Sequence, residues 1–170
     1  MTHPENKVRW CLNKAEKELA AGGKHRGLIK TNPDIGKARD HIAKAEHNIK
    51  ATLYLQKGGY TDWCSSTLFY AVYHCFLAVL AKSGYESRNQ ECTFALIEDL
   101  IEKGSLDITK VEMEKISMLD VEEKHQSPTA VEIREEFQYG TKLSFEDKSL
   151  EELLKLAQTI LDKTKIFLEK

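Results

Sequence analysis

Apolar residues recur along most of this chain at the spacing of an amphipathic helix. The clearest stripe lies near the C-terminus, with Glu and Lys opposite, and consists of Leu150, Leu153, Leu154, Ala157, Ile160, Leu161 and Phe167. The segment Trp63–Lys82 is apolar nearly all round, which predicts the central and most buried helix. No stretch alternates with period two for long enough to indicate a sheet.

Glycines and capping residues divide this pattern into separate helices. Thr109 and Thr129 each stand three positions before a glutamate, the spacing of a capping box. Glycines that favour a left-handed helix end follow four segments, at Gly22–Gly23, Gly58–Gly59, Gly84 and Gly104. We expect helices at residues 5–21, 34–57, 62–82, 88–103, 109–120, 130–139 and 148–168. Short connections favour an antiparallel bundle, and the polar residues 122–129 predict a mobile loop.

Length and charge narrow the class of protein. The chain has 170 residues, 41% of them hydrophobic, and a net charge of -2. These values fit one globular domain, and the net charge does not indicate a nucleic-acid or membrane partner. The N-terminus has no apolar signal core, and the apolar run Leu68–Ala81 is short for a bilayer and interrupted by His74. We therefore expect a cytoplasmic protein without membrane contact.

The four cysteines are Cys11, Cys64, Cys75 and Cys92. None belongs to a C-x-x-C pair, so the usual zinc and redox spacings are absent. We expect four free thiols in a reducing compartment, with no metal and no cofactor.

Three segments follow one another in a recognisable order. They are the long helix with Lys44–Ile49 that ends in Lys57–Tyr60, the aromatic run Ser66–His74, and the arginine segment Ile133–Gly140 before the last helix. Together they resemble the HEPN domain family. The resemblance implies an all-α, HEPN-like antiparallel bundle of four or five helices at residues 31–170. Residues 1–30 then form an extra N-terminal helix and a basic loop packed on the core. The resemblance also implies a homodimer that cleaves RNA, binds nucleotide or RNA, or pairs with a small nucleotidyltransferase in toxin–antitoxin or defence modules.

One departure from the family concerns the chemistry. Ribonuclease members carry Arg-x-x-x-x-His, which Arg134 begins, but Tyr139 stands where the histidine belongs. Tyrosine, with a reference pKa of about 10, is a poor base near neutral pH, whereas Arg134 can still hold a phosphate. The resemblance therefore favours a non-catalytic nucleotide- or RNA-binding protein with Arg134 accessible at a cleft. Tyr139 and Tyr70 would line that groove, and Arg88, at a helix start, would add a phosphate contact.

Other interpretations stay open. His74 can replace the missing histidine and, with Arg134, make a metal-independent ribonuclease, or it can be a buried structural histidine. Tyr70 can be a core aromatic residue, and Arg88 a surface residue at a capped helix. The basic loop Gly22–Lys30 can bind phosphate or be a solvated linker, but it lacks the spacing of a P-loop. A third class of function is a helical scaffold that docks on a protein partner.

Overall fold

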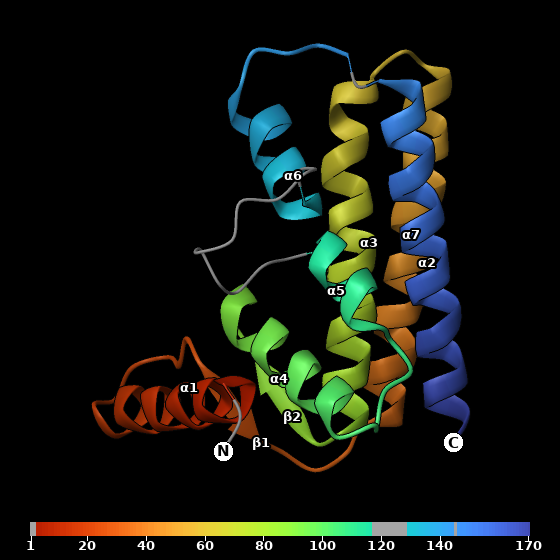
Figure 1. Ribbon diagram of the computed structural model, residues 1–170. Coiled ribbons are helices and arrows are strands. Elements are labelled where there is room, and N and C mark those ends of the chain that lie inside the picture. Colours follow the sequence, from red (N-terminus) through yellow and green to blue (C-terminus); the bar gives the residue numbers. More distant parts are fainter. Residues whose placement is uncertain (1–2, 117–128, 145) are drawn as a thin grey trace.

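The computed structural model describes residues 3–116, 129–144 and 146–170. These residues form α1 (His3–Ala20), β1 (Leu28–Lys30), α2 (Ile35–Lys57), α3 (Thr61–Lys82), β2 (Tyr85–Ser87), α4 (Gln90–Glu102), α5 (Lys110–Ile116), α6 (Ala130–Tyr139) and α7 (Asp147–Glu169). Figure 1 shows α2, α4, α6 and α7 gathered around α3, with α1 off to one side. The prediction of an all-α helical bundle is confirmed.

The centre of the bundle is α3, which contacts α2, α4, α6 and α7. Its fully buried Phe76 packs edge-on against Phe94 of α4, with ring centroids 5.7 Å apart. Contrary to expectation, α3 is long and apolar enough to cross a membrane, the one such helix among the described residues. However, 67% of its most apolar window is buried inside the bundle, as in the core helix of a soluble protein.

The helices α2 and α3 form an antiparallel hairpin, and α7 packs against both. In Figure 1, α2 runs antiparallel to α3 and to α7. The predicted stripe of α7 is confirmed, because its buried apolar residues are Leu150, Leu153, Ala157, Ile160 and Leu161. The helix is therefore held by one apolar face, with charged side chains in solvent.

The ends of the helices also follow the sequence signals. Positive φ angles occur at Gly22, Gly59, Gly84 and Gly104, as predicted. The Thr129 hydroxyl accepts a hydrogen bond from the backbone N–H of Glu132, while the Glu132 carboxylate accepts one from the N–H of Thr129. This capping box fixes the start of α6. The helix predicted at residues 109–120 is described only as far as Ile116, and the loop predicted at 122–129 lies outside the described residues except for Thr129.

The prediction of no sheet is wrong, because β1 and β2 pair as a short antiparallel ribbon with Ile29 opposite Glu86. Strands of three residues are too short to leave a period-two pattern. The ribbon depends on Gly84, whose φ is +77° and whose backbone lies close to Thr31. A Cβ atom there would stand 2.9 Å from the Thr31 carbonyl oxygen, so only glycine fits.

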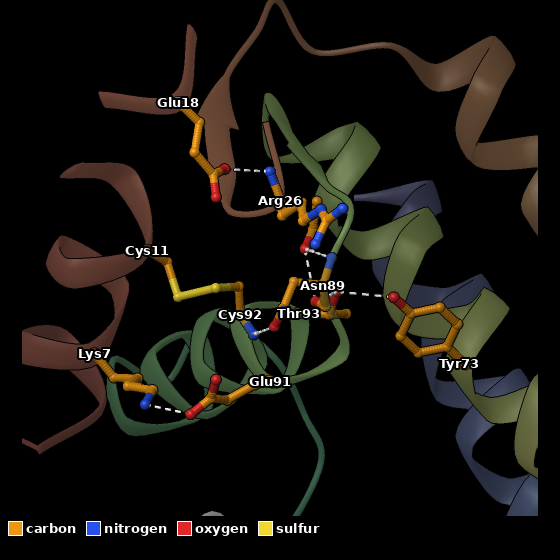
Figure 2. The surroundings of a disulfide bond; sticks show 10 residues. Lys7, Cys11, Glu18, Arg26, Tyr73, Asn89, Glu91, Cys92 and Thr93 are labelled. Atoms are coloured by element: carbon orange, nitrogen blue, oxygen red, sulfur yellow. Dashed lines mark hydrogen bonds and ion pairs between the residues drawn. A yellow bond between two sulfur atoms is a disulfide. The ribbon is translucent and has the colours of Figure 1, made fainter. Parts of the chain in front are cut away.

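The prediction of four free thiols is wrong for two of them. Cys11 of α1 and Cys92 of α4 form a fully buried disulfide whose Cα atoms are 5.8 Å apart (Figure 2). The two cysteines are separated by 81 residues, so no local spacing revealed the pair. Lys7 forms an ion pair with Glu91 beside this bond. The remaining cysteines, Cys64 and Cys75, are free and buried.

Candidate functional site

Arg134 lies on α6 against an aromatic ring of α3. Its guanidinium carbon is 4.5 Å from the centroid of the Phe69 ring, a cation–π contact. One terminal nitrogen donates to the carboxylate of neighbouring Glu135 at 3.1 Å. The Nε atom is buried and has no hydrogen-bond partner among the described residues. A buried donor without a partner is costly, so this guanidinium has capacity to bind an acceptor.

Phe69 belongs to an aromatic cluster that joins α3 and α4. The Tyr70 ring meets it edge-on with centroids 5.4 Å apart, and the Tyr73 ring stacks on it at 6.0 Å. The Tyr73 hydroxyl lies 3.3 Å from the hydroxyl of Thr93 on α4, as Figure 2 shows. Burial raises the pKa of Tyr73. Tyr70, by contrast, is 42% exposed, so its ring is open to a ligand.

His74 is half-buried and lies one turn beyond Tyr70 on α3. Its Nδ1 is 3.0 Å from Nδ1 of His41 on α2, and the two rings share this hydrogen bond. Burial, with smaller contributions from His41 and Lys44, lowers the pKa of His74 to about 4. Burial and the charge of Lys37 also lower the pKa of His41. Both imidazoles are therefore neutral at pH 7.

The other two candidate residues lie apart from Arg134. Tyr139 is 76% exposed and, being five positions after Arg134, is rotated from it by about 140° around α6. Gln138 occupies the face of Arg134 one turn later. Arg88 ends the β ribbon, and its Nε donates to Glu86 at 3.0 Å. The structure therefore gathers Arg134 and Tyr70 around Phe69 but does not add Tyr139 or Arg88.

These positions can be set against known families. A sequence model of the HEPN domain matches residues 38–167. This chain belongs to the HEPN domain family. HEPN domains are of nucleotide-binding and ribonuclease type. A search of curated proteins finds no match.

The HEPN match contains Arg134, Tyr139, Tyr70, Arg88 and His74, but α1 and β1 lie outside it. The helix α1 contacts α4 and β1, and the disulfide joins it covalently to the HEPN part of the chain. All five candidate residues therefore lie in the HEPN part of the chain.

The expectation that Arg134 is accessible at a cleft is not met. Its side chain is only 11% exposed, and its guanidinium lies on the Phe69 ring. A cavity of about 520 Å³ lies between α5, α6 and α7 and is lined by Glu112, Lys115, Ile133 and Lys155, among others. Arg134 lines neither this cavity nor the one beside it at the start of α7. A ligand at Arg134 has to approach its edge and displace Glu135.

The cysteines and histidines give no metal cluster, since no three His, Cys, Asp or Glu side chains converge within the described ranges. Burial raises the pKa of Cys64 to about 11 and that of Cys75 to about 12. Thiols of this kind are poor nucleophiles near neutral pH.

Two histidines with structural partners were missed from the sequence. His41 faces His74 where α2 packs on α3. Its neighbour in the sequence, Ile42, is one of the buried apolar residues of α2, and this apolar position was the signal that could have placed His41 near α3. His25, in the basic loop, is 4% exposed, with Nε2 3.5 Å from the Glu86 carboxylate. Glu86 also binds Lys37 and Arg88; burial opposes the charge of Glu86, but those two hydrogen bonds outweigh it and lower its pKa. The loop is thus not a simply solvated linker, although Lys24 and Arg26 are exposed.

Proposed function

We propose that this HEPN protein binds the phosphate of a nucleotide or of RNA at Arg134 and lacks efficient ribonuclease activity. The observation that carries the proposal is the Arg134 guanidinium on Phe69, with its buried Nε unpartnered among the described residues and its one ion pair made to an exposed neighbour. The Glu135 side chain is 55% exposed, so water solvates its carboxylate once it leaves Arg134. Exchange of Glu135 for a phosphate therefore costs little and gains charge-assisted hydrogen bonds.

Tyr70 supplies the second half of this site. Its exposed ring stands edge-on to Phe69, on which Arg134 lies. Stacking of a base on an exposed aromatic ring contributes about 1–3 kcal/mol without requiring a particular sequence. A base on Tyr70 with its phosphate at Arg134 is the arrangement that the residues favour.

The face of α6 that carries Arg134 favours binding over cleavage. Gln138 follows Arg134 on that face, and an amide cannot take up a proton near neutral pH. Tyr139, at the position of the family's histidine, points into solvent instead. A proton acceptor for the 2′-hydroxyl would have to come from elsewhere.

One observation supports the alternative, a metal-independent ribonuclease with Arg134 and His74. His74 is half-buried rather than sealed in the core. Its pKa of about 4 leaves the ring unprotonated at pH 7, although it is then a weaker base than an ordinary histidine. In that mechanism the 2′-hydroxyl attacks the adjacent phosphorus, His74 takes the hydroxyl proton, and Arg134 stabilises the phosphorane.

Exposed aromatic side chains support a protein partner as well. Tyr54, Tyr60 and Trp63 are 79%, 60% and 58% exposed and cluster in sequence around the α2–α3 turn. Aromatic residues are enriched at protein interfaces. We propose a homodimer through this end of the hairpin, in a toxin–antitoxin or defence module with a small nucleotidyltransferase. Light scattering of wild type and Trp63→Ala tests the dimer: a monomeric wild type contradicts it.

The test of function compares binding and cleavage in one set of variants. Fluorescence anisotropy with a labelled eight-nucleotide oligouridylate measures binding by wild type, Arg134→Ala and Arg39→Ala, which removes an exposed arginine of α2. We expect Arg134→Ala to weaken binding about tenfold or more and Arg39→Ala to leave it unchanged. Equal binding by all three proteins contradicts the proposal. Turnover of the RNA that both Arg134→Ala and His74→Ala abolish would establish the ribonuclease instead.

A further inference from the structure

The His41–His74 pair has the geometry of two rings that point directly at each other. The ring centroids are 5.3 Å apart and the Nδ1 atoms 3.0 Å apart. The difference is about two ring radii, so both nitrogens lie close to the line between the centroids. One imidazole donates its Nδ1–H and the other accepts with its Nδ1 lone pair, and either ring can take either role. The pair therefore shares a single proton along this line.

This geometry differs from that of a two-histidine metal site. Two imidazoles on one ion would both aim their nitrogens at a third point, about 2.0–2.1 Å from each. Here each nitrogen aims at the other, and no third His, Cys, Asp or Glu joins them within the described part of the chain. The proton between the rings explains their arrangement without an ion.

The surroundings of the pair are mainly cationic. Lys37 lies one turn before His41, and Lys44 lies three residues after it, so all three follow one face of α2. Both lysines act on the pair electrostatically, and Asp40 opposes them at His41. Lys37 is held by Glu86 at 3.2 Å, whereas Lys44 is exposed. On α3 the nearest polar neighbour along the helix is Tyr70. A proton added to the pair would be repelled by Lys37 and Lys44 and attracted by Asp40, so an accompanying anion would favour it.

The pair lies on the same side of α3 as Tyr70. His74 follows Tyr70 by four residues, one turn of the helix. It follows Phe69, whose ring Arg134 covers, by five residues, a rise of about 7.5 Å and a rotation of about 140°. A strand whose base stacks on Tyr70 therefore meets the histidine pair on that side of α3 and passes around the helix to reach Arg134.

We propose that His41 and His74, with Lys44, form a second phosphate subsite, so that the ligand of this protein is single-stranded RNA rather than a mononucleotide. The inference rests on the proposed phosphate site at Arg134. When the second phosphate arrives, the pair takes up one proton from solvent. The shared Nδ1–H···Nδ1 bond persists, both Nε2 atoms then carry hydrogen, and the net charge of +1 on the pair meets the phosphodiester. No covalent bond changes.

The test compares a ligand with several phosphates to a ligand with one. Binding of labelled oligouridylate and of uridine monophosphate is measured at pH 6.0, 7.0 and 8.0 for wild type, His41→Gln, His74→Gln and Lys44→Ala. The control is His47→Gln, since His47 is an exposed histidine of α2 that faces away from the pair. Circular dichroism confirms that each variant is folded, and Lys44→Ala, an exposed site, tests the subsite without touching the packed seam.

We expect the three subsite variants to weaken oligouridylate binding about tenfold at pH 6.0, with uridine monophosphate and His47→Gln unaffected. Wild type should bind the oligonucleotide more tightly as the pH falls from 8.0 to 6.0, and His41→Gln and His74→Gln should lose that dependence. Unchanged oligonucleotide binding by these variants, or an equal effect on both ligands, overturns the subsite. Unchanged binding by Arg134→Ala overturns the proposed function itself, so the two failures are distinguishable.

Discussion

The two sides of α3 show how one helix serves both the fold and the site. On one side, Phe76 is fully buried and packs edge-on against Phe94. On the other, Tyr70 and His74 are partly exposed, and His74 has a hydrogen-bond partner on α2. On the buried side, the volume that each side chain fills decides which residue fits, because a packed core tolerates few changes of shape. Polar partners and room for a ligand characterise the second.

The largest expected effect comes from the buried side. Phe76→Ala should lower the free energy of unfolding by about 3–5 kcal/mol, since it removes a buried ring and leaves a cavity. Tyr70→Ala, on the exposed side, should cost less than about 1 kcal/mol but weaken RNA binding. Urea denaturation measures both. Similar losses of stability in the two variants would contradict this distinction between the buried and the exposed side of α3.

The disulfide stabilises the same core from outside, through α4. Replacing both Cys11 and Cys92 by serine should lower the free energy of unfolding by about 2–5 kcal/mol, because the bond closes a long loop of the unfolded chain. RNA binding at Arg134 should persist, since α1 lies outside the proposed site. Urea denaturation measures the stability and fluorescence anisotropy the RNA binding of the same variant. Stability that is insensitive to the double substitution would show that the bond does not hold α1 to the bundle.

A smaller effect sharpens the comparison on the exposed side. His74 has a pKa of about 4 in the folded chain, against an ordinary value for histidine of 6.5. As the pH falls below about 6.5, the unfolded chain binds a proton that the folded chain does not, so folding stability decreases until about pH 4. Because His74 is partly exposed, the loss is about 1 kcal/mol after discounting for solvent. His74→Gln should show a shallower decline than wild type between pH 7 and pH 4; parallel curves would contradict the assignment.

Much of the fold could be predicted because helices leave a long periodic record. The stripe from Leu150 to Phe167 and the glycines after each segment predicted α7 and several helix ends. The β ribbon was missed because Leu28–Lys30 and Tyr85–Ser87 are each too short to alternate visibly. The disulfide was missed because only the docking of α1 on α4 brings Cys11 to Cys92.

The site was less predictable, because it depends on contacts between helices. The family resemblance pointed to Arg134, but not to its position on Phe69, which requires α6 to pack on α3. Tyr139 was expected beside it, yet five residues of helix turn its side chain away. No local pattern in the sequence pointed to the pairing of His41, because its partner His74 is 33 positions along the chain.

The most direct measurement of the central claim is the NMR signal of the Arg134 Nε–H group. In ¹⁵N-labelled protein this buried group should give a resolved resonance, assigned by its absence in Arg134→Lys. Addition of uridine monophosphate should shift it progressively to saturation, because the phosphate replaces Glu135 on the guanidinium. A resonance that stays unmoved while the nucleotide binds elsewhere, or while no nucleotide binds at all, would contradict phosphate recognition by Arg134.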